Sequence, residues 1–301
     1  MNIGFVGIGN LGSKLAASLR RAGFGLTVHD LDPANGESLV ADGAIWADTI
    51  AGVAADADVV ITCLPSPAAA AAVVGGNHGV LASLSPGSTW IEMSTTDKHE
   101  LQRLAAIGTA RGIDTLEAPV TGGVHLAATG EITVIVGGDQ AVAERHHALL
   151  AAMGKRIFYV GPLGRASDLK VVTNMLAFIH LVACGEALAL SAEAGLDLRQ
   201  AWEVIAASSG TSFVHETEGQ LILNGSYDIG FTIDLAMKDL GLALSLGEET
   251  GVPLELASRT ASAFETARER YGGSAPSPMV VRLLEEAIGR ELRAPGFPDR
   301  L

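Results

Sequence analysis

The chain is poor in cysteine and in aromatic residues. It holds two cysteines among 301 residues, and aromatic residues make up 5% of it. Cys63 and Cys184 lie in apolar stretches without the CxxC spacing of a redox or zinc site. We therefore expect two buried free thiols, no metal site and a reducing, cytoplasmic compartment. The uncharged run 171–185 is too short to cross a bilayer, and residues 3–6 already look like a strand rather than a signal peptide.

Positive charge is also scarce. Lys and Arg together number 20 against 34 Asp and Glu, which gives a formal net charge of −14. Such a surface repels nucleic acid and anionic membranes, so we expect neither as a partner. The net charge does not exclude a small anionic substrate, because that ligand responds to the local field of its pocket.

Apolar content is high, and in the first half it follows an alternating pattern. Hydrophobic residues make up 48% of a chain long enough for two domains. Short β-rich runs alternate with helical ones, which predicts a mostly parallel sheet with helices on both faces. The expected strands are 2–8, 26–30, 58–64, 89–94, 113–119, 132–138 and 156–161.

The strand pattern ends at Gly164. A helix of some thirty residues follows, which we expect to be capped by Ser167 or a neighbour and to end at Gly195. Further helical segments cover 197–209 and 232–251. The long helix is too apolar for a solvated connector, so we expect part of it to contact another subunit in a homodimer or homotetramer.

A glycine-rich loop stands at the very start of the chain. Gly7, Gly9 and Gly12 form a GxGxxG pattern, with Asn10 and Leu11 in the same loop, directly after a strand and at the beginning of a helix. Gly7 allows the tight turn, Gly9 lets a pyrophosphate approach the backbone, and Gly12 lets helix and strand pack closely. In this setting the loop predicts dinucleotide binding.

The residue at the end of the second strand indicates which dinucleotide is used. The carboxylate of Asp30 can accept hydrogen bonds from the ribose hydroxyls of NAD and would repel the 2′-phosphate of NADP. Leu31 stands where a protein that binds NADP often has Arg. We predict NAD in preference to NADP. In the alternative interpretation, Asp30 or Asp32 only begins a turn before Pro33.

A turn rich in small residues lies between two later strands. Thr121, Gly122 and Gly123 expose backbone N–H groups and one hydroxyl, which together can hold a carboxylate. A plain connecting loop is the alternative.

A lysine and an amide open the long helix. Lys170 and Asn174 are four residues apart and therefore neighbours on one helix face. A desolvated lysine has a lowered pKa and can exchange a proton with an alcohol near neutral pH. In the alternative, the lysine extends its ammonium group into water from the first turn.

A second lysine lies in an apolar helix, in the pair Lys238 and Asp239. It could contact a cofactor or substrate, or form one charged edge of an amphipathic helix. Adjacent residues of a helix do not face each other, so we do not expect a salt bridge within the pair.

The motifs together, in their order, resemble a known family. They are the loop at residues 7–12, "CLPSP" (63–67), "MSTTD" (93–97), "APVTGG" (118–123), "GPLGxxxxxKxxxN" (161–174) and "KDL" (238–240). This combination is similar to the β-hydroxyacid dehydrogenases, near 3-hydroxyisobutyrate dehydrogenase and tartronate semialdehyde reductase, from residue 2 to about 290. The resemblance implies an α/β Rossmann-type domain, residues 1–163, and an all-α domain, residues 164–301. The second begins with the long helix and is similar to the C-terminal domain of 6-phosphogluconate dehydrogenase.

The resemblance also implies roles for individual residues. Lys170 is the general acid/base, and Thr121, Gly122 and Gly123 hold the substrate carboxylate. Asn174 and Phe231 line the substrate pocket. Leu64, Pro65, Thr95 and Lys238 join the glycine loop and Asp30 in binding the cofactor.

The implied reaction interconverts a small 3-hydroxy acid and its semialdehyde by hydride transfer to NAD. Two alternatives stay open: an NADH-dependent reductase of a tartronate, succinate or sulfonate semialdehyde, and a dinucleotide-binding regulator without turnover. The chain departs from the family pattern at Thr121, where Ser is usual, and in 271–280, which lacks an acidic residue found in many relatives. Thr173 stands where 6-phosphogluconate dehydrogenases have His, which argues against a sugar-phosphate substrate.

Overall fold

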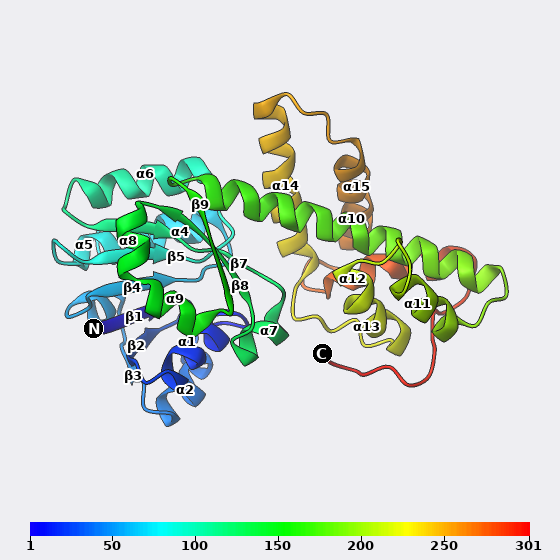
Figure 1. The fold of residues 1–301 in the computed structure, drawn as a ribbon, viewed down its shortest axis with the longest axis horizontal. Helices are drawn as coiled ribbons and strands as arrows, with labels where there is room; N and C mark the ends of the chain where they lie inside the picture. Colours follow the sequence, from blue (N-terminus) through cyan, green and yellow to red (C-terminus); the bar gives the residue numbers. More distant parts are fainter. The chain divides into compact units, whose positions relative to one another are not determined.

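The apolar runs of the first half form the strands of one sheet (Figure 1). The computed structural model describes residues 1–301. All seven expected strands are present, together with two strands of two residues each, β3 and β7, which are too short to give a pattern. The strands are β1 (Asn2–Val6), β2 (Gly25–His29), β3 (Ile45–Trp46), β4 (Val59–Thr62), β5 (Thr89–Glu92), β6 (Asp114–Glu117), β7 (Val120–Thr121), β8 (Thr133–Gly138) and β9 (Arg156–Gly161).

The sheet is mostly parallel, as predicted. Its order is β3-β2-β1-β4-β5-β6-β8-β7, and β9 pairs with β8. The pairs from β3 to β6 are parallel, whereas β8 runs antiparallel to β6 and β7. Chain order reverses direction between β1 and β4, so the loops after these two strands flank the position where such sheets bind dinucleotides.

Helices cover both faces of this sheet. Along β4, Val59 and Ile61 belong to one apolar core and Val60 to the other, so both faces of the strand are buried. The helices are α1 (Gly12–Arg21), α2 (Glu37–Ala41), α3 (Ile50–Ala54), α4 (Pro67–Gly75), α5 (Val80–Ser83), α6 (Lys98–Thr109), α7 (Val124–Thr129), α8 (Gln140–Arg145) and α9 (His147–Met153), with one 3₁₀ turn, η1 (Pro33–Gly36).

The long helix α10 spans Arg165–Glu193. It ends at the predicted place, because Gly195 adopts φ 77°. Of the expected caps, Ser167 or a neighbour, Ser167 is wrong, because it lies inside the helix. A side chain from β6, Glu117, accepts hydrogen bonds from the first turn. By length and composition alone α10 could cross a membrane, a criterion that the core helix of a globular protein also meets.

The chain divides into two compact units within α10, Met1–Lys170 and Val171–Leu301. From the sequence we placed the domain boundary between residues 163 and 164. The second unit is entirely helical, so the predicted fold class is confirmed. After α10 it contains α11 (Leu198–Ala206), α12 (Phe213–Glu216), α13 (Glu218–Asn224), α14 (Ile233–Thr250), α15 (Glu255–Tyr271), η2 (Ser277–Val281) and α16 (Arg282–Ile288).

The second unit has a core of its own. Leu188, Leu240 and Phe264 are fully buried in it. Thr232 caps α14 by accepting a hydrogen bond from Leu235 N at 3.3 Å, and Gly251 ends that helix in the left-handed conformation. The helix predicted over 232–251 is therefore present with both of its termini.

Candidate functional site

The glycine loop has the geometry that a dinucleotide requires. Gly7 has φ 89°, and a Cβ there would lie 2.3 Å from the carbonyl oxygen of Cys63. A Cβ at Gly12 would lie 2.0 Å from the carbonyl oxygen of Gly7. A Cβ at Gly9, in contrast, would meet no atom within 4 Å, so this backbone faces open space. Two of the glycines serve packing and the middle one leaves room for a ligand.

The helix that follows the loop has an uncapped N-terminus. Leu11 precedes α1 and provides no side-chain hydrogen bond, and the first turn carries no acidic residue. By comparison, Ser66 caps α4 and Asp97 caps α6. Ser13 N and Lys14 N donate to Gly9 O and Leu11 O, both at 3.0 Å. Without an acidic side chain at this end, the positive dipole of the helix stays available for an anion. The residues present therefore fit the pyrophosphate of a nicotinamide dinucleotide.

Asp30 lies beside the same loop. Its Oδ2 accepts a hydrogen bond from Ile8 N at 2.8 Å, and its Oδ1 accepts from Asp32 N at 3.1 Å and from Asn35 Nδ2 at 3.2 Å. Asp32 caps the following 3₁₀ turn, η1, by accepting a hydrogen bond from Ala34 N at 3.0 Å. Asp30 is thus fixed against the loop, while Asp32 begins the turn.

A buried glutamate organises the loops after β4 and β5. Glu92 is 1% exposed and accepts hydrogen bonds from Thr62 Oγ1 at 3.0 Å and Ser94 N at 2.8 Å. Ser94 Oγ in turn accepts from Leu64 N at 2.7 Å. This network fixes the backbone at the start of the predicted cofactor loop. In the sequence, Glu92 looks like an ordinary strand residue, and its role becomes visible only in the structure.

The remaining predicted cofactor residues of the first unit follow the same strands. Leu64 and Thr95 are half-buried and Pro65 is exposed. Because the carboxyl ends of parallel strands meet at one edge of the sheet, these residues lie on the same edge as the glycine loop.

The turn at residues 121–123 leads into a short helix, α7, that the sequence pattern does not predict. Thr121 ends β7, Gly122 has φ 125°, and Gly123 has φ 89° and precedes α7. A Cβ at Gly122 would lie 2.9 Å from Leu126 Cδ1. Two successive residues adopt conformations that favour glycine, so the backbone of this turn depends on Gly122 and Gly123.

Lys170 is buried, with 8% of its surface exposed. The alternative in which its ammonium group extends into water does not fit this burial. Its helix begins at Arg165, and the first turn donates hydrogen bonds to Glu117 from Gly164 N at 2.6 Å and Ser167 N at 2.8 Å. Burial raises the pKa of the Glu117 carboxyl, and these hydrogen bonds counteract part of that effect.

In the second unit, a buried aspartate joins the two other predicted polar residues. Asn174 Nδ2 donates to Asp239 Oδ2 at 2.6 Å, and Lys238 Nζ lies 2.9 Å from Asp239 Oδ1. The expectation of no salt bridge between Lys238 and Asp239 is therefore wrong. Although the two Cβ atoms diverge, the long lysine stem folds back far enough for its ammonium group to reach the carboxylate. Asp239, 1% exposed, was not identified as a site residue.

Phe231 belongs to the apolar part of the same unit. Its ring stacks on Phe178 with centroids 6.0 Å apart, and its carbonyl oxygen accepts from Ser277 N at 2.8 Å. Both contacts hold the segment before α14 in place.

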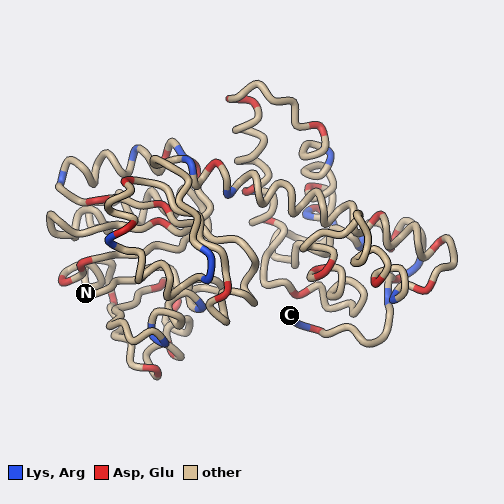
Figure 2. The backbone as a smooth tube through the Cα atoms, viewed as in Figure 1, with Lys and Arg blue, Asp and Glu red and all other residues tan.

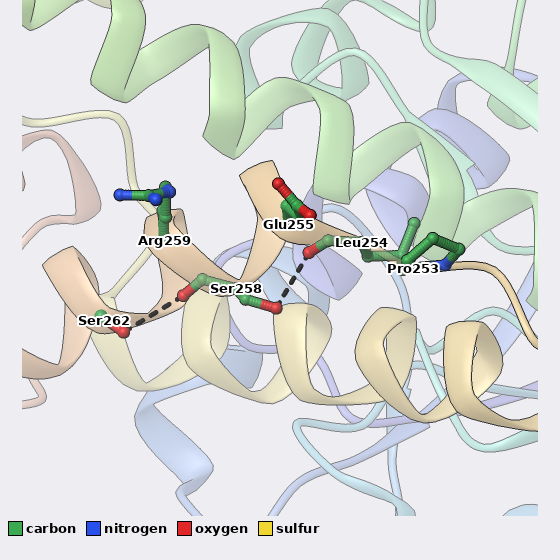
Figure 3. A pocket seen from close by; sticks show the side chains of 6 residues that line it. All are labelled: Pro253, Leu254, Glu255, Ser258, Arg259 and Ser262. Carbon is green, nitrogen blue, oxygen red and sulfur yellow. Dashed lines mark hydrogen bonds between the residues drawn. The ribbon is translucent and has the colours of Figure 1, made fainter.

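An open depression elsewhere on the second unit is a weaker candidate (Figure 3). It lies at the start of α15 and contains none of the predicted residues. Ser258 Oγ donates to Leu254 O at 2.9 Å and Ser262 Oγ to Ser258 O at 3.2 Å (Figure 3). Its hydroxyls are thus used by the helix backbone.

Comparison with known families identifies both parts of the chain. Residues 2–161 match the NAD binding domain of 6-phosphogluconate dehydrogenase. Residues 164–284 match the domain described as NAD-binding of NADP-dependent 3-hydroxyisobutyrate dehydrogenase. The two matches together span both structural units.

Individual relatives cover nearly the whole chain. The chain is 34% identical to 2-(hydroxymethyl)glutarate dehydrogenase of Eubacterium barkeri over 96% of each protein. It is 31% identical to NAD-dependent L-serine dehydrogenase of Pseudomonas aeruginosa, over 96% of this chain and 99% of that one. A crystal structure of 3-hydroxyisobutyrate dehydrogenase from Salmonella typhimurium covers 94% of this chain and 99% of its own, with TM-score 0.87 and 31% identity. The chain therefore belongs to the β-hydroxyacid dehydrogenase family of NAD(P)-dependent enzymes.

Proposed function

We propose that this enzyme interconverts a small 3-hydroxy acid, of the 3-hydroxyisobutyrate type, and its semialdehyde with NAD. The observation that carries the proposal is a buried lysine, Lys170, on the helix that follows a complete dinucleotide-binding fold. The relatives named above act on different hydroxy acids, so family membership alone does not select the substrate.

NAD is the proposed cofactor. The backbone of Gly7–Gly12 and the N-terminus of α1 would hold the pyrophosphate, and Asp30 would accept the ribose hydroxyls. The exposed Leu31, 96% accessible, offers no charge to a 2′-phosphate. When bound, the nicotinamide accepts or supplies the hydride. Leu64, Pro65, Thr95 and Lys238 are proposed to bind the same cofactor.

The substrate carboxylate is proposed to bind at Thr121, Gly122 and Gly123. Their backbone N–H groups and one hydroxyl would replace the water that an anion loses on binding. Asn174 and Phe231 are proposed to orient the rest of the acid. Holding the reactants in contact geometry can supply on the order of 7 kcal/mol of the barrier reduction.

Lys170 is proposed to move the proton. In the oxidation direction its neutral amine takes the hydroxyl proton as the C–H bond breaks, and in reduction its ammonium group returns that proton to the carbonyl oxygen. The same residues therefore serve both directions, and an NADH-dependent semialdehyde reductase is the second candidate. A regulator without turnover would need no such proton carrier.

A substrate panel tests the proposal. 3-Hydroxyisobutyrate, L-serine and 2-(hydroxymethyl)glutarate are assayed with NAD and NADP, and tartronate and succinate semialdehydes with NADH. We expect turnover of at least one hydroxy acid, fastest with NAD. Enhanced NADH fluorescence on binding without turnover of any of these acids would instead support the regulator.

A further inference from the structure

Glu117 is a buried carboxylate to which the chemistry above assigns no role. It ends β6, is 1% exposed, and is the register partner of Glu92 on β5. Its other neighbour in the sheet is Gly137 on β8. A Cβ at Gly137 would come 2.3 Å from Glu117 Oε1, so the carboxylate occupies space that only a glycine leaves.

The hydrogen bonds to this carboxylate come from Gly164, directly before α10, and from the first turn of that helix. Oε1 accepts from Gly164 N at 2.6 Å and Ala166 N at 3.0 Å. Oε2 accepts from Ser167 N at 2.8 Å and Ser167 Oγ at 2.5 Å. The first N–H groups of a helix lack partners within the helix, and a carboxylate satisfies them and also complements the helix dipole. Glu117 thus caps α10 from about fifty residues earlier in the chain.

Helix α6 holds the same turn from another direction. Gln102 Nε2 donates to Leu163 O at 3.1 Å, and Lys98 Nζ lies 3.4 Å from Asp168 Oδ1. These contacts are partly exposed and individually worth little. Glu117 is buried and has four donors, whereas Gln102 and Lys98 each provide one contact to the turn.

Lys170 follows this turn directly. It lies three residues after Ser167, so the two side chains are neighbours on the helix surface. An amine that must meet a substrate hydroxyl at hydrogen-bond distance needs its helix fixed along the axis and in rotation. A displacement of about 1 Å at a catalytic group can reduce the rate roughly a hundredfold.

We propose that Glu117 is a positioning residue: by binding the first turn of α10 it sets the place and direction of the Lys170 amine. The inference rests on the proposed role of Lys170 in proton transfer. It differs from a purely structural role in what it predicts, because a merely structural carboxylate would affect stability without a selective effect on turnover.

The test compares Glu117→Gln, Glu117→Asp and Glu285→Gln. Glutamine keeps the shape of the side chain but places an NH₂ group opposite N–H donors. Aspartate keeps the negative charge, but its shorter side chain moves the carboxylate away from these donors. Glu285 is the matched control, since it is 5% exposed and accepts from Tyr227 Oη at 2.7 Å and Leu292 N at 2.8 Å in the other unit. Activity is measured on whichever of 3-hydroxyisobutyrate, L-serine and 2-(hydroxymethyl)glutarate the wild type oxidises fastest.

We expect kcat to fall roughly a hundredfold in Glu117→Gln and about tenfold in Glu117→Asp, with KM changed less than about threefold. NADH binding, followed by fluorescence, should stay at the wild-type value. Hydrogen–deuterium exchange of the free protein supplies a readout independent of turnover: amides of residues 163–168 should exchange faster in both Glu117 variants. In Glu285→Gln both kcat and exchange at 163–168 should match the wild type.

Wild-type kcat and wild-type exchange in a folded Glu117→Asp or Glu117→Gln would overturn the inference, as would an equal loss of kcat in Glu285→Gln. Lys170→Ala is assayed beside them. If that variant retains full activity, the proposed function fails. If it is inactive while the Glu117 variants behave like the wild type, only the positioning role fails.

Discussion

Asp30 combines two tasks in one carboxylate. It holds Ile8 N of the glycine loop at 2.8 Å and is proposed to select the ribose of NAD. The neighbouring Leu31 is 96% exposed, so a new side chain there meets little protein. Cofactor preference should therefore depend on this pair of residues more than on the loop itself.

The double variant Asp30→Ala, Leu31→Arg tests this. Removing the carboxylate and adding a guanidinium beside the site of the 2′-phosphate should raise the NADP-to-NAD ratio of kcat/KM by about tenfold or more. The variant should also be somewhat less stable, because Ile8 N loses its acceptor. The control Leu31→Gln alone adds no charge and should keep the wild-type ratio. A double variant with an unchanged preference would remove these two residues from cofactor selection.

At this scale the sequence reveals residues whose chemistry is local. Gly7, Gly9 and Gly12 form their pattern within six residues, and Lys170 stands out because its surroundings are apolar. Glu117 and Asp239 could not be predicted, since their partners lie about 50 and 65 residues away in the chain. A carboxylate that reads as a strand or helix residue becomes a helix cap or an amide acceptor only after folding.

Among the elements, the turn at 121–123 offers a direct test of substrate binding. Ala at Gly122 would place a methyl group 2.9 Å from Leu126 Cδ1 and force φ 125° on a residue with a Cβ. We predict that Gly122→Ala raises KM for the hydroxy acid by about tenfold and leaves NADH binding unchanged.

Gly130→Ala provides the matched control for this turn. Gly130 ends α7 with φ 75°, and its Cβ would approach only Ser18 Oγ at 3.9 Å. That variant carries a similar backbone penalty without changing the turn, so its KM should stay near the wild-type value. Equal KM values in the two variants would show that the turn does not bind the substrate.

Helix α13 begins with a carboxyl group whose ionisation opposes folding. Burial raises the pKa of Glu218 from its ordinary 4.5 to about 8. As the pH rises, Glu218 loses its proton at a lower pH in the unfolded chain than in the folded protein. The free energy of unfolding should therefore fall between about pH 4.5 and about pH 8. We predict that Glu218→Gln raises the Tm at pH 9 by clearly more than at pH 5.

The exposed neighbour Glu216 supplies the comparison for that measurement. Glu216→Gln should change the Tm by a similar small amount at both pH values. If Glu218→Gln also changes the Tm by the same amount at pH 5 and pH 9, the pKa of Glu218 is not raised in the folded protein.

Long helices and strands can be predicted from the sequence more readily than short ones. The sequence predicts α10 and α14 because each is a long, largely apolar segment without internal proline that is followed by a glycine, Gly195 and Gly251. It misses β3 and β7, which have two residues each, and α7, which has six. Pairing with β2 and β8, rather than a period of their own, defines the strands β3 and β7.

Over the whole molecule, charge and apolar surface are unevenly distributed. Figure 2 shows Asp and Glu in both units, whereas the middle of α10 carries no charged residue. Four apolar side chains of this helix are exposed at spacings close to the heptad repeat: Leu169 by 40%, Val172 by 42%, Leu176 by 47% and Leu190 by 73%. A stripe of this kind is typical of a helix that packs against a second chain.

We predict a homodimer or homotetramer in solution, with this stripe in the interface. Light scattering should give two or four times the 30.9 kDa of one chain. Leu190→Glu should shift the mass toward one chain, whereas Val204→Glu, at an exposed position of α11, should leave it unchanged. A wild-type mass of 30.9 kDa at micromolar concentration would contradict this prediction.

The measurement that bears most directly on the central claim is turnover by Lys170→Ala beside its affinity for NADH. If the lysine moves the proton, kcat should fall by about 10²–10⁴, NADH binding should stay at the wild-type value, and added methylamine should restore part of the rate. A variant that oxidises the preferred hydroxy acid at the wild-type rate would show that another group carries the proton.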